Sequence, residues 1–289
     1  MIILIGLVVT FGCLFGGYMA MGGHIGVIWQ PWEYVIIGGS SVGIFFIANP
    51  MKVVKDSGVA ILEAFKDKAP KQSDYLELLA LLYSITRELR DKPKSEVEAH
   101  IDDPENSEIF QNYERILADE SLTTFICDYC RIIIMGDAQA HEVSDLMDVE
   151  IKTLLKDKLK AQHALQNMAD GLPALGIVAA VLGVIKAMGA LDQSPELLGK
   201  LIGAALVGTF AGIFMSYGLV GPIASKIKVV REKQVRPYII VKQTLLVYMN
   251  GATPQVAIEH GRKTISAYER PTIDETENET IGGGVAAEA

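Results

Sequence analysis

The chain has 289 residues, half of them hydrophobic and only 7% aromatic, with a mean hydropathy of +0.28 and a formal net charge of −9. That hydropathy is high for a soluble protein of this length, and the acidic balance argues against nucleic acid as a partner, which requires a basic surface. The negative charge lies in the middle of the chain, because residues 51–170 hold 24 acidic and 15 basic side chains.

Two pairs of apolar stretches flank this charged middle. Residues 1–51 contain a single charged side chain, Glu33, which divides an apolar run in two, and residues 171–185 and 201–225 contain none. About 20 apolar residues in a helix cross a hydrocarbon core of about 30 Å. The sequence therefore predicts an all-α membrane protein with four transmembrane helices in two hairpins and a large helical cytoplasmic domain. The four helices are expected at residues 1–22, 34–50, 171–190 and 201–225.

The distribution of lysine and arginine predicts the orientation. The connector at residues 23–32 has no basic residue and that at 191–200 has only Lys200, whereas 51–170 has 15 and the chain after Ser225 has nine. Both connectors are expected outside the cytoplasm and both termini inside it. The first helix lacks the basic start and cleavage site of a signal peptide, so it is expected to be retained.

This pattern divides the chain into five segments. They are a first hairpin at 1–50, a cytoplasmic helical domain at 51–170, a second hairpin at 171–227, cytoplasmic helices at 228–270 and an acidic tail at 271–289 that is expected to be disordered. Apolar spacing predicts a helix over Tyr75–Leu89, broken at Asp91–Pro93. Further helices are expected over 95–101, 108–118, 122–135, 141–169, 229–250 and 254–267. No alternating strand pattern is present.

Glycines four residues apart occur in both hairpins, a spacing that lets helices approach closely. The pairs are Gly12 and Gly16, Gly39 and Gly43, and Gly208 and Gly212. Two interpretations are open: packing within one subunit, or packing against other subunits or a partner helix.

No predicted span has a carboxylate in its middle. Asp170 lies at the cytoplasmic edge of the third span and Lys186 near its outer end, and the polar groups of the fourth span are Thr209, Ser216 and Tyr217. Proton relays run through Asp, Glu or His, and a hydroxyl does not change its charge at physiological pH. If ions cross here, another chain must supply the carboxylate. Taken alone, a threonine such as Thr209 is more often a bonded hydroxyl at a helix interface than part of an ion path.

Two interpretations, one structural and one functional, are open for two proline residues in the membrane spans and for two charged residues in the cytoplasmic domain. Pro173 and Pro222, near the cytoplasmic ends of the third and fourth spans, mark either a helix start and a helix break or a pair of hinges. Arg90 and Glu98 flank the Asp91–Pro93 break. They are either solvated surface charges or part of a docking surface that orients a partner.

No enzyme, metal or cofactor signal is present. Cys127 and Cys130 lie within an apolar helical pattern with no second pair, so they are expected to pack structurally and to stay reduced. The five histidines are scattered, and no phosphate-binding loop, nucleophile elbow or dinucleotide fingerprint occurs. The sequence predicts neither an enzyme nor a bound metal or cofactor.

Several long segments of the chain are distinctive. They are LLALLYSITRELR, which ends at Arg90, then HIDDPENSEIF, YERILADESLTTFICDY, DGLPALGIVAAVLGV, ALVGTFAGI, SYGLVGPIA and NGATPQVAIEHGRKT. Together they resemble the MotA family of flagellar stator subunits, within the wider MotA/TolQ/ExbB group. The resemblance extends along nearly the whole chain.

The resemblance implies a bacterial inner-membrane pentamer, in contact with lipid, around a dimer of MotB, whose single membrane helix supplies an ion-binding Asp. It implies that Arg90 and Glu98 engage the rotor protein FliG, that Pro173 and Pro222 couple conformational change, and that Thr209 belongs to the ion path. Asp170 and Ala180 complete the candidate path.

The resemblance also bears on the ion. Sodium-driven relatives carry a threonine where Ala180 stands here, and a hydroxyl helps to replace the hydration shell of Na⁺. Ala180 therefore favours H⁺ over Na⁺ as the translocated ion.

Two rival functions are open. One is an energy transducer of the ExbB/TolQ type that drives an outer-membrane process. Such proteins usually have three spans, so the first hairpin and the Arg90–Glu98 segment argue against it. The other is a self-sufficient channel or a membrane scaffold.

Overall fold

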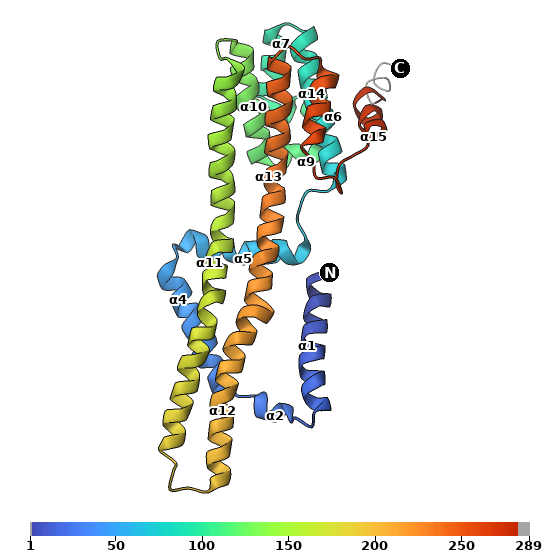
Figure 1. Ribbon diagram of the computed structural model, residues 1–289. Coiled ribbons are helices and arrows are strands. Elements are labelled where there is room, and N and C mark those ends of the chain that lie inside the picture. The colour runs from blue at the N-terminus through green and yellow to red at the C-terminus, as the bar shows by residue number, and fades with distance from the viewer. Residues whose placement is uncertain (1, 283–289) are drawn as a thin grey trace. The chain divides into compact units, whose positions relative to one another are not determined.

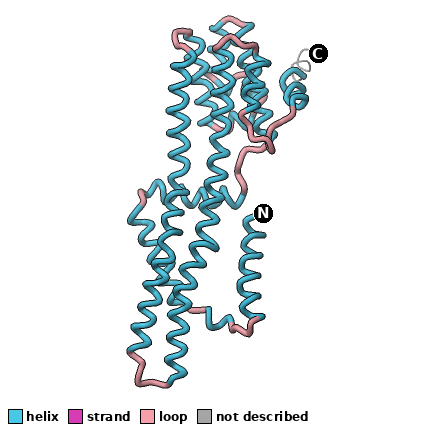
Figure 2. Tube along the Cα trace, viewed as in Figure 1, coloured by secondary structure: helices cyan, strands magenta, loops and turns pink. Residues whose placement is uncertain are grey.

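The computed structural model describes residues 2–282, with side chains described to residue 280, and no strand occurs in this range. Figure 2 shows helices joined by short loops. The chain forms two compact units. The first, here called the membrane unit, comprises residues 1–68 and 158–231, and the second unit comprises 69–157 and 232–289. The long helices α11 and α13 each contribute residues to both units.

Four helices are long and apolar enough to cross a membrane, as the sequence predicts. They are Ile2–Ala20, Pro31–Ala48, and apolar windows within Ala140–Met188 and Pro195–Met249. One bound differs in a way that matters. The second span begins at Pro31, so Glu33 is its third residue rather than a residue between two spans, and the middle of each of the four spans still holds no carboxylate.

The membrane unit is built from helices that bury small side chains and leave large apolar ones exposed. Its elements are α1 (Ile2–Ala20), α2 (Ile25–Ile28), α3 (Pro31–Tyr34), the π-helical turn η1 (Val35–Gly39), α4 (Ser40–Ala48), α5 (Met51–Lys66), the second part of α11 (Ala140–Met188), α12 (Pro195–Phe214), the π-helical turn η3 (Met215–Val220) and the start of α13 (Gly221–Met249). No residue of α1 is buried. Such surfaces suit contact with lipid or other membrane helices.

The second unit has a conventional hydrophobic core around α6. Its elements are α6 (Gln72–Asp91), α7 (Lys94–Asp102), η2 (Pro104–Asn106), α8 (Glu108–Gln111), α9 (Glu114–Leu117), α10 (Glu120–Met135), α14 (Pro254–Lys263), α15 (Ile273–Glu277) and η4 (Asn278–Gly282), with the first part of α11 and the second part of α13. Leu79, Leu82 and Ile85 of α6 are fully buried. A helix that is apolar around most of its circumference belongs inside a core.

Cys127 and Cys130 are buried in this core, which confirms the structural interpretation of the pair. Burial raises the pKa of the Cys127 thiol to about 11 and raises that of Cys130 as well. Thiols in that state are poor nucleophiles and poor metal ligands at neutral pH.

The predicted helices are present, with two differences in continuity. The helix expected over residues 108–118 is interrupted at Tyr113, which has φ −128° and ψ 63° and whose hydroxyl lies 3.2 Å from Ser84 Oγ. In contrast, the helix expected to end at residue 169 continues without a break to Met188. Pro173 therefore does not start a helix, and Pro222 does not break one, because the helical chain runs on from α12 through η3 into α13.

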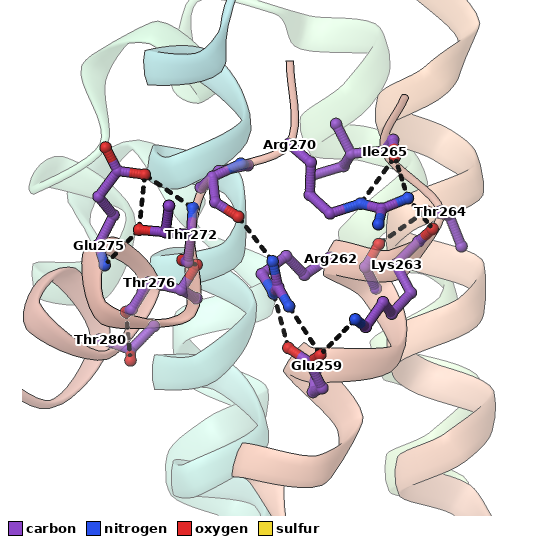
Figure 3. Close-up of polar contacts among 12 residues, drawn as sticks. Glu259, Arg262, Lys263, Thr264, Ile265, Arg270, Thr272, Glu275, Thr276 and Thr280 are labelled. Atoms are coloured by element: carbon purple, nitrogen blue, oxygen red, sulfur yellow. Dashed lines mark hydrogen bonds and ion pairs between the residues drawn. The ribbon is translucent and has the colours of Figure 1, made fainter. Parts of the chain in front are cut away.

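The first part of the acidic tail also differs from the expectation of disorder. Thr272 Oγ1 accepts a hydrogen bond from the Glu275 N–H, the Glu275 carboxylate accepts one from the Thr272 N–H, and α15 follows. Just before this capping box, Arg262 donates a hydrogen bond to the Pro271 carbonyl oxygen, 2.6 Å away (Figure 3). The capping box stabilises the first turn of α15, and the bond from Arg262 holds the residue just before it, so these local hydrogen bonds favour an ordered segment. Residues 283–289 lie outside the described residues.

The five predicted segments are divided where the chain is expected to enter or leave the membrane. The two compact units are instead defined by which residues pack together. Residues 51–68 and 158–170, expected in the cytoplasmic domain, pack with the membrane unit. There Ala60 and Ala64 of α5 contact a small core that includes Ala161 and Leu165 of α11. The membrane boundaries themselves stay predictions.

Candidate functional site

Helices α11 and α12 lie side by side (Figure 1). They pack at very short range along a seam of small residues. A Cβ atom built on Gly212 would lie 2.7 Å from Gly176 Cα and 2.7 Å from the Leu172 carbonyl oxygen. One built on Gly183 would lie 2.7 Å from Ala205 Cβ. Only glycine fits at such positions without a shift of the helices. The Gly208–Gly212 pair therefore packs within the subunit, whereas Gly12, Gly16, Gly39 and Gly43 face open space in the single chain.

The seam brings together two of the predicted ion-path positions. A Cβ atom on Gly208 would lie 3.3 Å from the Ala180 backbone nitrogen, so Ala180 contacts the residue next to Thr209. Thr209 is partly exposed, and no side-chain hydrogen bond ties its hydroxyl to the described part of the chain. The structure thus leaves this hydroxyl free to face a further helix or an ion.

Asp170 does not join this contact. It lies ten residues before Ala180 on the same helix, or about 15 Å along the axis, and its carboxylate accepts a hydrogen bond from Gln166 Nε2 at 2.8 Å. Among the predicted path residues, Ala180 and Thr209 are neighbours and Asp170 stands apart.

Glu33 reaches the same place from the second span. Its Oε2 lies 3.0 Å from the position of a Cβ on Gly208, is buried, and has no hydrogen-bond partner among the described residues. Sequence reasoning missed this contact because Glu33 was taken to lie between two spans. The available signal was that Glu33 is the only charged side chain in the first 51 residues.

Pro222 follows directly on a π-helical turn. In η3 the Gly221 N–H bonds to the Ser216 carbonyl oxygen, five residues back. A π-turn accommodates a proline, whose ring would otherwise meet the carbonyl of the preceding turn. The two π-turns are in contact, because a Cβ on Gly38 of η1 would lie 3.6 Å from Met215 Cε of η3. Such turns are frequent at functional sites.

Pro173 lies inside α11, partly exposed, next to the buried Leu172 of the seam. Its missing N–H leaves α11 with one hydrogen bond fewer at this point. Both predicted hinge residues therefore lie within long continuous helices, beside the glycine seam and the π-turn respectively.

A buried ion-pair cluster connects α5 to α13 after Pro222. Arg231, only 6% exposed, places Nη2 2.8 Å from Asp56 Oδ1 and Nε 3.0 Å from Glu63 Oε2. Lys226 also lies 2.6 Å from Asp67. Nothing in the sequence spacing indicates these partners, which are more than 150 residues apart.

Arg90 and Glu98 are exposed on the second unit, on either side of the turn between α6 and α7. Arg90 Nε lies 2.8 Å from Asp91 Oδ1, and this hydrogen bond raises the pKa of Arg90 and lowers that of Asp91. Glu98 has no ion pair with any described residue. The turn thus presents charges that are available to a partner.

No group of three or more His, Cys, Asp or Glu side chains gathers into a metal site within residues 2–282. The polar geometry described above contains no nucleophile bonded to a base. Its chemistry is that of a tightly packed helix pair with one carboxyl whose Oε2 is buried and unbonded, and one unbonded hydroxyl.

Comparison with known proteins decides the family. A model described as "Motility protein A N-terminal" matches residues 4–93, and one described as "MotA/TolQ/ExbB proton channel family" matches 114–238. Motility protein A of Salmonella typhimurium is 42% identical over 277 residues, covering 96% of this chain and 94% of the relative. The Escherichia coli protein of the same name is 41% identical over the same shares. The chain belongs to the motility protein A family.

The solved structures agree in fold. "Structure of C. jejuni MotAB" contains a chain with a TM-score of 0.75 at 19% identity, covering 93% of this chain and 97% of that one. A flagellar MotAB stator complex from Bacillus subtilis gives 0.70 at 24% identity, covering 92% and 94%.

Membership of the motility protein A family makes this chain a membrane-embedded stator subunit of flagellar motility, and not an enzyme. The match at residues 4–93 covers the first hairpin and Arg90, which argue against an energy transducer of the ExbB/TolQ type. That match favours the stator function over the rival.

Proposed function

We propose that this chain assembles as a pentamer in the bacterial inner membrane, with both termini in the cytoplasm, around a MotB-type partner. The partner's single helix supplies the Asp that accepts H⁺, and the flow of H⁺ is converted into torque on the rotor protein FliG. Two observations support an assembly: the similar solved structures are titled MotAB, and the membrane unit leaves most of its large apolar side chains exposed.

The contact of Ala180 with Gly208, next to Thr209, carries the proposal for the ion path. The partner's helix lies against the partly exposed Thr209 face, where the Thr209 hydroxyl is unbonded and position 180 supplies no second hydroxyl. Protonation of the partner's Asp removes a charge from a low-dielectric environment, and that shifts the balance between two packings. Pro173 and Pro222 transmit the shift along α11 and α13, and Arg90 and Glu98 act on the rotor.

A charge-reversal experiment tests the rotor contact. Arg90→Glu and Glu98→Lys are expected to impair swimming while the complex still assembles, and reversal of an opposing rotor charge is expected to restore part of the motility. Glu120→Lys is a matched control, because Glu120 is an exposed acid of the same unit at the start of α10. Full motility in the Arg90→Glu, Glu98→Lys double variant would reject the role of the turn.

A second experiment tests the ion. Motor speed is measured while sodium is replaced by potassium at a constant proton-motive force. We expect an unchanged speed, and a speed that follows the sodium concentration would show that Na⁺ is the coupling ion.

A further inference from the structure

Glu33 combines features that ordinary packing does not explain. It is the third residue of the second membrane span, and its Oε2 is buried against Gly208 with no hydrogen-bond partner in the described chain. A buried carboxylate oxygen without a hydrogen bond is unfavourable while it is charged, and a proton relieves that cost. An acid retained inside a membrane segment is therefore a functional candidate.

The elements packed around Glu33 offer few other ionisable groups. Residues 201–214 of α12 and 171–185 of α11 contain none. Lys186 of α11 is the charged group whose field reaches Glu33. The segment before the span contributes His24, ahead of α2, and Tyr34, whose hydroxyl donates to the Ile28 carbonyl oxygen at 3.2 Å. Among the groups around Gly208, the Glu33 carboxyl is therefore the main one that can take up and release a proton.

The position of Glu33 relative to the candidate path gives the carboxyl a role. A Cβ atom on Gly208 would lie 3.0 Å from Glu33 Oε2 and 3.3 Å from the Ala180 backbone nitrogen, and Thr209 is the next residue of α12. Glu33 belongs to the end of its span that follows the 23–32 connector, which the basic residues predict to be outside. On this predicted orientation, the carboxyl lies on the outer-facing end of its span and next to the Ala180–Gly208 contact.

We propose that Glu33 is a proton-loading site of the stator, supplied by this chain in addition to the Asp of the partner. The Glu33 carboxylate takes a proton from a hydronium ion of the outer phase, which leaves water. The O–H bond then breaks as the proton passes toward the partner's carboxylate beside Thr209, and the Glu33 carboxylate is restored. This inference rests on the proposed function.

The test uses the full chain with its MotB-type partner in cells that lack their own stator. The speed of single motors is measured against external pH. Without a loading carboxyl, proton capture becomes limiting where protons are scarce. We therefore expect Glu33→Gln to slow the motor by roughly fivefold or more at an external pH of about 8.5, and the deficit to shrink toward none at about 6. Glu33→Asp is expected to restore most of the speed.

Glu196→Gln is the matched control. Glu196 is another carboxylate near the predicted outer side, but it is 82% exposed and pairs with Lys200 at 3.3 Å. The same loss of one negative charge is expected to leave the pH profile unchanged. A Glu33→Gln motor that equals wild type at every pH, or that is slowed by the same factor at every pH, would overturn the proposal, because the latter result indicates packing alone.

Assembly is monitored by copurification with the partner. If Glu33→Gln does not assemble, the dependence of motor speed on external pH in Glu33→Asp decides. A curve shifted along the pH axis supports proton loading. A curve lowered by the same factor at every pH contradicts it. Failure of the wild-type chain to rotate any motor would instead reject the proposed function, so the two failures are distinguishable.

Discussion

Gly176 and Gly212 pack backbone to backbone, with each Cα within 3.0 Å of the position that a Cβ on the other would occupy. This contact sets the distance between α11 and α12 and thereby the geometry at Ala180 and Thr209. A methyl group at such a position has to displace a helix, since backbone atoms surround it.

Gly212→Ala is accordingly expected to destabilise the protein by about 1–3 kcal/mol through overpacking. Gly203→Ala on the same helix is the matched control, because nothing lies within 4 Å of its Cβ position. The control is expected to be neutral, or stabilised by up to about 1 kcal/mol through helix propensity. Thermal unfolding of the purified protein in detergent compares the two variants. Equal midpoints would show that the seam does not constrain the helices.

The Arg231 cluster provides a second prediction. Arg231→Ala leaves Asp56 and Glu63 without their buried cation, and loss of one partner from a buried pair costs about 3–5 kcal/mol. We expect a large fall in the unfolding midpoint and reduced accumulation in the membrane.

The matched control for Arg231 is Lys200→Ala, which removes a basic side chain from an exposed pair. Its effect is expected to stay within about 1 kcal/mol. A Lys200→Ala midpoint as low as that of Arg231→Ala would mean that burial of the ion pairs has no special importance.

The sequence predicted what depends on local composition. The four spans follow from runs without charge, and the exposure of Arg90 and Glu98 follows from their place at a break marked by Pro93. The position of Glu33 inside a span was not predicted, because a charged residue is normally taken as the end of an apolar run. The structure shows that the helix starts earlier, at Pro31, a residue well suited to a first helical turn.

Features that depend on distant partners were beyond the sequence. Arg231 and Asp56 are 175 residues apart in the sequence, and no spacing rule connects the two. The continuity of α11 through Pro173 and the π-turn before Pro222 depend on neighbouring helices that stabilise a locally weakened backbone. Proline alone predicts a break.

The last prediction concerns pH and the pair Glu259–Arg262 in the second unit. Two hydrogen bonds, Arg262 Nε to Glu259 Oε2 at 2.6 Å and Nη2 to Oε1 at 2.8 Å, lower the pKa of Glu259 below its ordinary value of 4.5 (Figure 3). A carboxyl with a lowered folded-state pKa stabilises the fold fully above its unfolded value, and this contribution is lost as the pH falls through the folded value. The loss is therefore expected below pH 4.5.

Glu259→Gln is expected to reduce the free energy of unfolding by about 1–2 kcal/mol at neutral pH, a value moderated by the partial exposure of Glu259. Because glutamine does not titrate, the difference in unfolding midpoint between wild type and Glu259→Gln should shrink as the pH falls below 4.5. Glu277→Gln, which removes an exposed acid of α15, is expected to follow wild type throughout. If the unfolding midpoint of wild type stays above that of Glu259→Gln at the most acidic pH, the charge of the carboxylate is not the source of the stabilisation. The shape of the Glu259 side chain would then be the source.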